Sequence, residues 1–350
     1  MRDVVLAKDR SIGEEHPVFI IAEMSGNHLN DFNLAARIIE SAKAAGADAV
    51  KLQTYTADTL TIDCDNEHFR IKGTLWDGRT LHDLYAEAST PWDWQPRLKA
   101  LAEEMGLVLF SSPFDATAVD FLETMGVPCY KIASFENVDL PLIRRVAATG
   151  KPLIMSTGMA SEAELDEAVE TFRKAGGQDL VLLKCTSAYP APAQEMHLRT
   201  IPYLAEKYRV PVGLSDHGLG LAAPVAAVAL GARVIEKHLC LDRRLPGPDS
   251  TFSLTPAEFK VMVDAVREAE KALGRVCFEL TEKQKSSVVF RRSLFVVRDM
   301  QAGEVFSTEN VRSIRPGQGL HTRHLGEVLG RAASCAIAAG TPLSWKLVVG

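Results

Sequence analysis

The sequence predicts an α/β protein, a closed (β/α)8 TIM barrel followed by a small C-terminal domain. Eight short apolar runs alternate with longer amphipathic segments, which is the pattern of repeated βα units. The alternation extends over residues 1–273, close to the roughly 250 residues that such a barrel occupies. Short strand-like runs follow, so a second, different domain is expected after the barrel.

The eight runs and the segments between them can be placed from the sequence alone. Glycines mark where helices should stop, and Ser161 and Thr255 each precede a glutamate by the three residues of a capping box. Residues 57–87 interrupt the second unit and are expected to form a long loop over the barrel mouth. The predicted strands are 18–22, 49–52, 107–110, 129–132, 152–155, 180–183, 211–214 and 234–235, and the predicted helices include 34–45, 116–125, 140–148, 222–230 and 256–273.

The domain boundaries follow from the change of pattern. We expect a barrel domain over 1–273, a linker over 274–287 and a small domain over 288–350. Strand-like segments at 292–297, 311–314 and 341–345 surround an Arg-Pro-Gly-Gln-Gly turn in the last part. A domain of about 65 residues can bury only a small core.

The composition and net charge exclude some classes of protein and make others improbable. Hydrophobic residues make up 47% of the chain and charged residues 24%, which excludes disorder for most of it. A net charge of −6 disfavours nucleic acid as a partner. We recognise no signal peptide in residues 1–10 and no apolar run that could span a membrane. The six cysteines form no CxxC pair, so we expect reduced thiols in a cytoplasmic protein.

Polar residues follow every predicted barrel strand. Because active sites of such barrels lie at the carboxyl ends of the strands, these side chains are expected to converge on one mouth. They are Glu23, Lys51, Gln53, Ser111, Lys131, Ser134, Ser156, Lys184, Thr186, Ser187, Ser215, Asp216, His217, Glu236, Lys237 and His238.

Two histidines are candidate metal ligands. His217 and His238 end the seventh and eighth strands, which are neighbours about 4.8 Å apart in a barrel. Both imidazoles could therefore reach one divalent ion, although each could instead hydrogen-bond a loop. His28 could contact substrate or organise the first βα loop, and the sequence leaves both readings open.

Two lysines point to an anionic substrate. Lys51 and Lys131, near Ser134 and Ser156, could neutralise a phosphate dianion and a carboxylate, which indicates a phosphorylated acid. One lysine could instead pair with Glu23 or Asp249. A second chemistry would make Lys131 or Lys184 the Schiff-base lysine of a pyruvate aldolase, and spacing alone does not decide between them.

Other conspicuous residues are expected to be structural. Cys129 and Cys185 have no evident partner that would lower the pKa of a thiol, so we assign them to the core. Trp92 and Trp94 begin a helix and are expected to pack there rather than stack on a ligand.

Six motifs, in order along the chain, resemble the nonulosonic (sialic) acid synthases. They are IIAEMSGNH (20–28), VKLQTY (50–55), YKIAS (130–134), CTSAYP (185–190), GLSDH (213–217) and IEKH (235–238). Residues from about 290 to 345 are similar to the antifreeze-like (SAF) domain of that family, so the resemblance covers nearly the whole chain.

Within the family, the chain most resembles the pseudaminic acid synthases. Met24 and Ser25 after Glu23, Ser187, and the segment 249–252 are the markers. Leu29-Asn30 departs from the Asn-Gly that often follows Asn-His. The segment 246–249 also resembles some neuraminate synthases, so N-acetylneuraminate or legionaminic acid synthase remains the alternative.

The resemblance implies that phosphoenolpyruvate condenses with an N-acetylated amino sugar, 2,4-diacetamido-2,4,6-trideoxy-L-altrose, with C–O cleavage and phosphate release. It implies a divalent metal (Mn²⁺, Mg²⁺ or Co²⁺) on His217 and His238, Glu23 as the proton-transfer group, and a homodimer that exchanges its C-terminal domains. Arg315 of one subunit would then reach the N-acetyl group in its partner's barrel. The implied catalytic residues are Glu23, Lys131, His217 and His238, and the implied substrate-binding residues are Lys51, Gln53, Ser111, Ser134, Ser156, Ser187, Tyr189, Ser215, Asp249 and Arg315.

Two other functions compete with this one. A Schiff-base pyruvate aldolase would use the same barrel. A binding protein would recognise ice or carbohydrate with its C-terminal domain and carry a degenerate barrel, but the polar residues on all eight strands argue against it.

Overall fold

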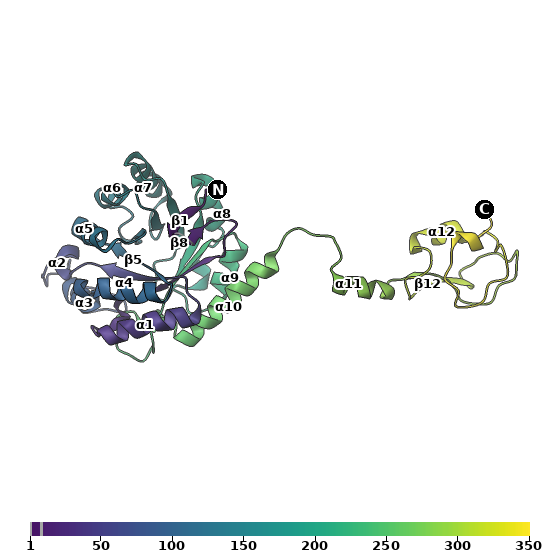
Figure 1. The fold of residues 1–350 in the computed structure, drawn as a ribbon, viewed down its shortest axis with the longest axis horizontal. Helices are drawn as coiled ribbons and strands as arrows, with labels where there is room; N and C mark the ends of the chain where they lie inside the picture. Colours follow the sequence, from purple (N-terminus) through teal and green to yellow (C-terminus); the bar gives the residue numbers. More distant parts are fainter. Residues whose placement is uncertain (1, 8–9) are drawn as a thin grey trace. The chain divides into compact units, whose positions relative to one another are not determined.

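The computed structural model describes residues 2–7 and 10–350, which divide into two compact units, residues 1–274 and 275–350. In the first unit eight parallel strands form a closed barrel in the order β10-β3-β4-β5-β6-β7-β8-β9, and helices lie around its outside (Figure 1). The predicted (β/α)8 barrel is therefore confirmed.

The barrel strands are buried along nearly their whole length, as expected of strands covered on both faces. Their registers bring carboxyl-terminal residues of neighbouring strands together: His238 pairs with Glu23, and Glu23 pairs with Lys51. The strands are β3 Phe19–Glu23, β4 Ala49–Thr54, β5 Val108–Pro113, β6 Tyr130–Ile132, β7 Leu153–Ser156, β8 Leu180–Cys185, β9 Val212–Asp216 and β10 Val234–His238.

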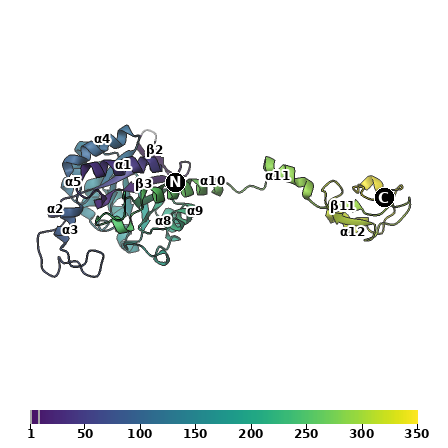
Figure 2. The ribbon, with the colours of Figure 1, turned by 90° about the horizontal axis from the view of Figure 1, so that it is seen from below.

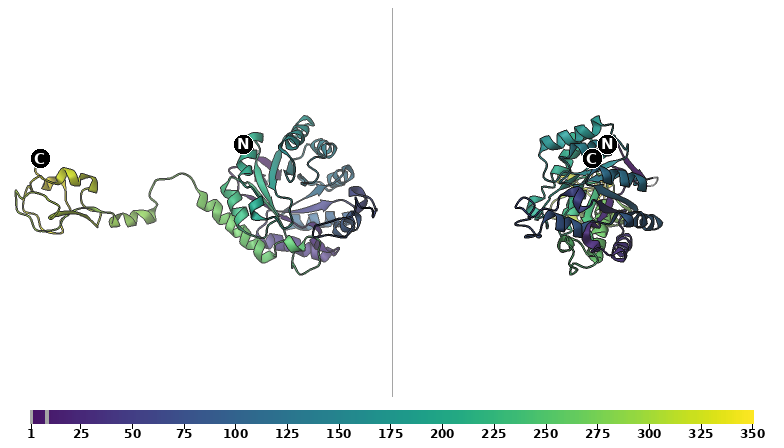
Figure 3. Two further views of the ribbon diagram at one scale, coloured as in Figure 1. Left: turned by 180° about the vertical axis from the view of Figure 1, so that it is seen from behind. Right: turned by 90° about the vertical axis from the view of Figure 1, so that its left-hand side faces the viewer.

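The outer helices surround the strands (Figure 3). Each buries one apolar face, which in α1 includes Ile38, Ile39 and Ala42. Both predicted capping boxes are present, with Ser161 beginning α7 and Thr255 beginning α10. The helices are α1 Phe32–Ala45, α4 Gln95–Glu104, α5 Ala116–Met125, α6 Leu140–Ala147, α7 Glu162–Lys174, α8 Thr200–Tyr208, α9 Ala222–Ala229 and α10 Pro256–Leu273, with short 3-10 turns η1 Ser25–His28, η2 Trp92–Trp94, η3 Ala193–Glu195 and η4 Ser250–Phe252.

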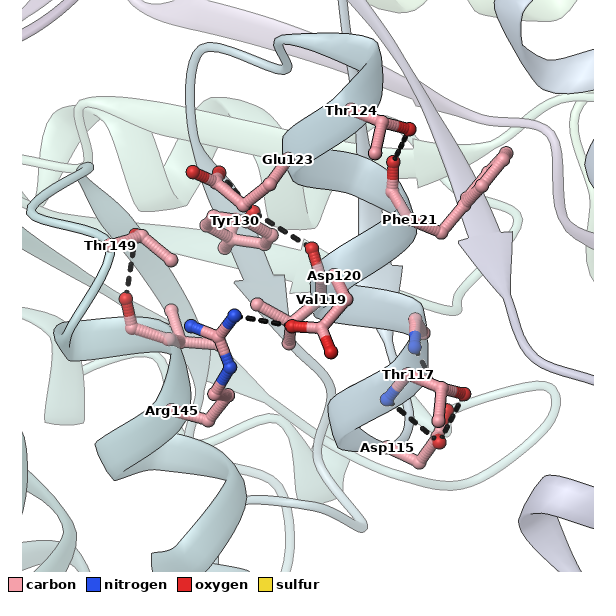
Figure 4. Close-up of polar contacts among 12 residues, drawn as sticks. Asp115, Thr117, Val119, Asp120, Phe121, Glu123, Thr124, Tyr130, Arg145 and Thr149 are labelled. Carbon is pink, nitrogen blue, oxygen red and sulfur yellow. Dashed lines mark hydrogen bonds and ion pairs between the residues drawn. The ribbon is translucent and has the colours of Figure 1, made fainter.

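Polar contacts fix α5 to its neighbours (Figure 4). Asp115 caps the helix by accepting hydrogen bonds from the Thr117 and Ala118 backbone N–H groups. Asp120 forms an ion pair with Arg145 of α6, and the Tyr130 hydroxyl of β6 donates to Glu123 over 2.5 Å. These contacts help hold β6, which ends next to the site described below.

A hairpin that the sequence analysis did not predict closes the amino-terminal end of the barrel. Strands β1 Val4–Ala7 and β2 Arg10–Ile12 pair antiparallel. Val4, Leu6 and Ile12 belong to the same buried cluster as the barrel's interior side chains, including Phe19 and Phe110. Strands this short carry too few residues for their alternation to be read.

The segment 57–87 is more ordered than the long loop we expected. It contains α2 Ala57–Leu60 and the beginning of α3 Leu81–Ala88. Between them lies a hairpin closed by an antiparallel bridge between Arg70 and Thr80. Figure 2 shows this segment as an excursion beside α3.

The second unit has a small apolar core that includes Leu294, Val296, Phe306 and Val311. Residues 341–345 form no strand and contribute one bridge, from Phe295 to Pro342. A short helix lies within the expected linker, 274–287. The elements are α11 Glu282–Ser286, η5 Ser287–Phe290, β11 Ser293–Val296, β12 Val311–Ile314, η6 Thr322–His324, α12 Leu325–Val328 and η7 Trp345–Leu347.

All six cysteines are free, as the sequence predicts. In residues 2–7 and 10–350, no helix is both long and apolar enough to cross a membrane.

Candidate active site

A cavity of about 330 Å³ lies at the carboxyl ends of the barrel strands. Most of the predicted site residues line it, so the structure brings together side chains from seven strands or the loops after them. These are Glu23, Lys51, Gln53, Lys131, Ser134, Ser156, Tyr189, Ser215, His217, His238 and Asp249.

Strand alternation explains which polar residues reach the cavity. On three strands the lining residues are two apart: Lys51 and Gln53, Ser215 and His217, Glu236 and His238. Successive side chains of a strand point to opposite faces, so Asp216 and Lys237 face away. These two form a buried ion pair with each other.

Three predicted substrate-binding residues do not line the cavity. Ser111 follows Phe110 of the barrel interior and therefore faces the helix layer, where its hydroxyl lies 2.6 Å from that of Thr54. Ser187 lies with its hydroxyl 3.8 Å from the Cys185 sulfur. Arg315 belongs to the second unit, whereas every residue around the cavity belongs to the first.

A buried charge cluster forms the floor of the cavity. The Lys51 ammonium lies 3.2 Å from a Glu23 oxygen and 3.2 Å from a Glu236 oxygen. Ser215 donates to the same Glu236 oxygen over 3.1 Å. The possible Lys51–Glu23 pairing is thus present, and it leaves Lys51 within the cavity wall.

Two carboxylates share one ammonium group, and their pKa values move apart. Burial raises the pKa of Glu23 to about 7, and the neighbouring Glu236 adds to this effect. Burial would also raise the pKa of Glu236, but Lys131 and Lys51 outweigh it and hold that pKa below its usual value. Glu23 can therefore carry a proton near neutral pH, while Glu236 stays ionised.

Lys131 is the second cation of the cavity. Its ammonium group donates to the Ser156 hydroxyl over 2.7 Å and to the Ile132 carbonyl over 3.0 Å. Burial lowers its pKa to about 8, so it remains mostly charged at neutral pH. Lys184 does not line the cavity and donates to the Cys185 carbonyl over 2.7 Å. Of the two lysines considered for a Schiff base, only Lys131 faces the cavity.

A chain of polar side chains runs across the mouth. The Gln53 amide donates to Glu23 and to the Ser25 hydroxyl, both over 2.9 Å, and Ser25 donates to Asp249. Ser25 has a φ of 49°, in the left-handed region that non-glycine residues seldom adopt. Such hydrogen bonds offset the strain, and they orient Asp249 toward the cavity.

The two histidines lie side by side, with ring centroids 5.3 Å apart. The His217 Nδ1 is 3.0 Å from the Thr186 carbonyl, whereas the buried His238 Nδ1 has no hydrogen-bond partner. Burial, together with His217 and Lys51, lowers the His238 pKa well below its usual value and keeps that ring neutral. A neutral imidazole with a free nitrogen is suited to bind a metal ion.

Cys185 differs from our expectation because it has a partner. Its sulfur lies 3.9 Å from the His217 Nδ1. Burial alone would raise the pKa of the thiol, but His217 lowers it to about 7. Cys129 is a core residue, as predicted, and burial raises the pKa of its thiol.

Three aromatic and imidazole side chains are structural. His28 is fully buried, with its Nε2 3.1 Å from the Thr90 hydroxyl, so it organises the first loop. Trp94 packs against His28, and Trp92 stacks on Phe121 with ring centroids 4.7 Å apart.

The sequence analysis missed several cavity residues. Glu136 lines the cavity with one buried oxygen that has no hydrogen-bond partner, and burial raises its pKa to about 7. Its position five residues after Lys131, in the loop that follows the same strand, was an available signal. Trp76 and Tyr85, from the segment 57–87, also line the cavity. Nothing in the strand pattern points to them.

Known proteins resemble this chain over most of its length. Residues 38–277 match the NeuB family, and residues 291–349 match the SAF domain. Pseudaminic acid synthases from two strains of Campylobacter jejuni are 50% and 51% identical to this chain over 93% of it and 95% of their own length. The N,N'-diacetyllegionaminic acid synthase of Legionella pneumophila is 37% identical over 95% of each chain.

A solved structure is similar to this chain in both fold and sequence. The N-acetylneuraminic acid (sialic acid) synthetase of Leptospira borgpetersenii, crystallised with citrate, superposes with a TM-score of 0.73. It is 32% identical, and the match covers 82% of this chain and 95% of that one. This chain therefore belongs to the NeuB family of synthases and carries a SAF domain after its barrel.

Proposed function

We propose that this chain condenses phosphoenolpyruvate with 2,4-diacetamido-2,4,6-trideoxy-L-altrose, the reaction of a pseudaminic acid synthase. The observation that carries the activity is the cavity in which Glu23, Lys51, Lys131 and the two histidines meet in a NeuB-family barrel. The observation that favours this sugar is the 51% identity to a pseudaminic acid synthase, against 37% to a legionaminic acid synthase.

The acid substrate is assigned to the cationic floor. Lys51 and Lys131 neutralise its phosphate and carboxylate, and Gln53, Ser134, Ser156 and Ser215 donate hydrogen bonds. We assign C3 of phosphoenolpyruvate to the side of the acid that meets the sugar aldehyde. C3 attacks that aldehyde, water adds at C2, and phosphate leaves with the bridging oxygen.

The sugar is assigned to the outer half of the cavity, where Asp249 and Tyr189 stand. Glu23, with its pKa near 7, is the group that can give and take a proton as the aldehyde oxygen becomes a hydroxyl. Glu136, missed by the sequence analysis, is a second carboxyl able to do so.

A divalent ion fits the histidine pair. The two rings are close enough to share one ion, and His238 has an unpartnered nitrogen. In the part of the chain that the structure describes, no cluster of three or more His, Cys, Asp or Glu is placed to hold a metal, so water or substrate would complete the shell. Mn²⁺, Mg²⁺ or Co²⁺ suits such a shell and would polarise the aldehyde as a Lewis acid.

The proposed enzyme is a homodimer in which Arg315 of one subunit contributes to the site of the other. We assign Arg315 to the sugar's N-acetyl group in the barrel of a partner subunit, because no arginine lines the cavity among residues 2–7 and 10–350. The six free cysteines support a cytoplasmic setting.

Phosphate release tests the reaction. With Mn²⁺ present, phosphoenolpyruvate and the trideoxy sugar should release phosphate, and an ¹⁸O label in the bridging position should appear in that phosphate. Pyruvate-dependent condensation with borohydride inactivation at Lys131 would instead establish the aldolase. A higher kcat/KM for N-acetylmannosamine would overturn the choice of sugar and leave the family assignment intact.

Metal removal tests the histidine pair. Chelation should abolish turnover, and Mn²⁺ should restore it, because two imidazoles and water form a site that the chelator outcompetes. His217→Ala and His238→Ala should lose activity and Mn²⁺ binding measured by electron paramagnetic resonance. Full turnover by metal-free enzyme would contradict the assignment.

A further inference from the structure

Trp76 is presented by a small closed hairpin, residues 69–81. Its two arms are joined by backbone hydrogen bonds from Ile71 N–H to the Arg79 carbonyl over 2.9 Å and from Gly78 N–H to the Ile71 carbonyl over 3.0 Å. At the tip, the Asp77 carboxylate accepts a hydrogen bond from Gly73 N–H over 2.9 Å. The indole is thus held on an ordered turn and not on a free loop.

The Trp76 side chain reaches two loops that follow other barrel strands. Its Nε1–H donates to the Pro248 carbonyl over 2.9 Å, 172 residues away in sequence. Its ring centroid lies 6.0 Å from that of Tyr189, whose ring in turn lies 4.4 Å from His217. Pro248 directly precedes Asp249. Trp76 therefore connects the hairpin to both groups assigned to the sugar.

Trp76 belongs to an apolar side of the cavity. Ile71, Leu81 and Leu84, from α3 and its preceding hairpin, line the cavity with it, and Phe114 joins them from the loop after β5. The two cations of the cavity, Lys51 and Lys131, stand on the barrel strands β4 and β6. Phosphoenolpyruvate on Lys51 and Lys131 would meet the aldehyde at carbon 1 of the open-chain sugar, which would leave carbon 6, at the other end of the sugar, to this apolar side.

We propose that Trp76 determines the specificity of the site by presenting apolar surface to carbon 6 of the sugar, so that a methyl group is favoured over a hydroxymethyl group. This inference rests on the proposed function. A hydroxyl against the indole face would give up water without gaining a hydrogen bond from Trp76, whose N–H is already donated to the Pro248 carbonyl. Since an apolar pocket rejects an added hydroxyl only moderately, we expect a preference of about 10- to 100-fold.

Steady-state kinetics with a matched pair of sugars tests this role. The 6-deoxy diacetamido sugar and its 6-hydroxy counterpart are compared for wild type, Trp76→Phe and Trp76→Asn. Trp76→Asn should bring the kcat/KM ratio to within about 3-fold of unity, since the amide can pair with the hydroxyl. Trp76→Phe should keep the preference, because it keeps the apolar surface. The KM for phosphoenolpyruvate should stay unchanged in both variants.

A matched control comes from the same hairpin. Leu75 is 52% exposed and does not line the cavity, so Leu75→Asn should keep the wild-type preference. Loss of preference in Leu75→Asn as well would show that the effect comes from general loosening of the hairpin, and would overturn the role of Trp76. An unchanged preference in Trp76→Asn would overturn it too.

Binding of unreactive alditols separates this inference from the proposed reaction. Reduced forms of the two sugars cannot condense, and calorimetry gives their dissociation constants in the presence of phosphoenolpyruvate. Tighter binding of the 6-deoxy alditol by wild type, lost in Trp76→Asn, supports the inference even if no phosphate is released. Equal binding of both alditols by wild type overturns it, even if turnover establishes the synthase.

Discussion

Single residues in this cavity acquire their chemistry from burial and from the charges beside them. Lys51 lies between Glu23 and Glu236, and one ammonium group cannot fully compensate two buried carboxylates. Burial and the neighbouring Glu236 raise the pKa of Glu23, so Glu23 is the carboxyl that takes up a proton, whereas Lys131 and Lys51 hold the pKa of Glu236 below its usual value. Paired carboxyl groups with separated pKa values are the usual arrangement for proton transfer at neutral pH.

Glu136 gives a pH-dependent prediction at this scale. Burial raises its pKa from 4.5 to about 7, so between these values the folded protein holds a proton that the unfolded chain has lost. The free energy of unfolding should therefore fall as pH rises from about 4.5 to about 7, and level off above. A glutamine at position 136 does not titrate. Across this range the free energy of unfolding of wild type should therefore fall by up to about 3 kcal/mol relative to that of Glu136→Gln.

Urea unfolding of wild type and Glu136→Gln at pH 5 and pH 8 measures this difference. Glu206→Gln, at a glutamate on α8 outside the cavity, is the control and should follow wild type at both values. The opposite result would contradict the prediction. If the free energy of unfolding of wild type rose from pH 5 to pH 8 relative to that of Glu136→Gln, the folded state would favour the ionised Glu136 carboxylate.

At the scale of elements, close contact between β9 and β10 places His217 beside His238. Gly213 of β9 permits that approach: a Cβ at this position would lie 2.4 Å from the Val234 carbonyl oxygen and 2.6 Å from the Val234 Cβ. Neither atom can move without displacing β10. The alternation on both strands then points Ser215, His217, Glu236 and His238 into one cavity.

Gly213→Ala should consequently destabilise the barrel by overpacking, by about 1–3 kcal/mol. It should also weaken Mn²⁺ binding, because the two histidine-bearing strands are forced apart. Thermal unfolding and a metal titration give the two readouts. Gly220→Ala is the matched control, since a Cβ there meets nothing within 4 Å, and it should leave both unchanged. If Gly213→Ala had the same melting temperature as wild type, β9 and β10 would be able to accommodate the added methyl group, and the prediction would be wrong.

At the scale of the whole molecule, the chain combines a complete barrel cavity with a separate small unit that carries Arg315. If subunits exchange these units, each active site is built from two chains. Arg315→Ala should then raise the KM of the sugar far more than that of phosphoenolpyruvate, because Arg315 is assigned as the donor to the acetamido oxygen of the sugar and to no group of the acid substrate.

Mixed dimers test the exchange. A dimer formed from an Arg315→Ala subunit and a Lys131→Ala subunit should regain one working site, since one barrel keeps Lys131 and receives an intact Arg315. Circular dichroism should first show that both inactive variants are folded. Verified mixed dimers that stay inactive would mean that each small unit serves its own barrel.

The sequence by itself determined the barrel and the strand ends at which the chemistry lies. The local signals are continuous apolar runs, glycines at helix ends and capping boxes. Closure of the barrel then places the carboxyl ends of all strands at one mouth. Glu23, Lys51 and the two histidines could therefore be found without coordinates. The motifs added the family, because their order along the chain is specific.

Only the tertiary structure decided which polar residues share the cavity. A shift of one residue along a strand reverses the direction of a side chain, so Lys237 pairs with Asp216 while its neighbours Glu236 and His238 line the site. Ser111 turns to the helix layer for the same reason. Trp76 comes from an excursion with no strand periodicity, and its contact with Pro248 joins residues 172 positions apart. Such long-range contacts depend on how the chain packs, and no local pattern encodes them.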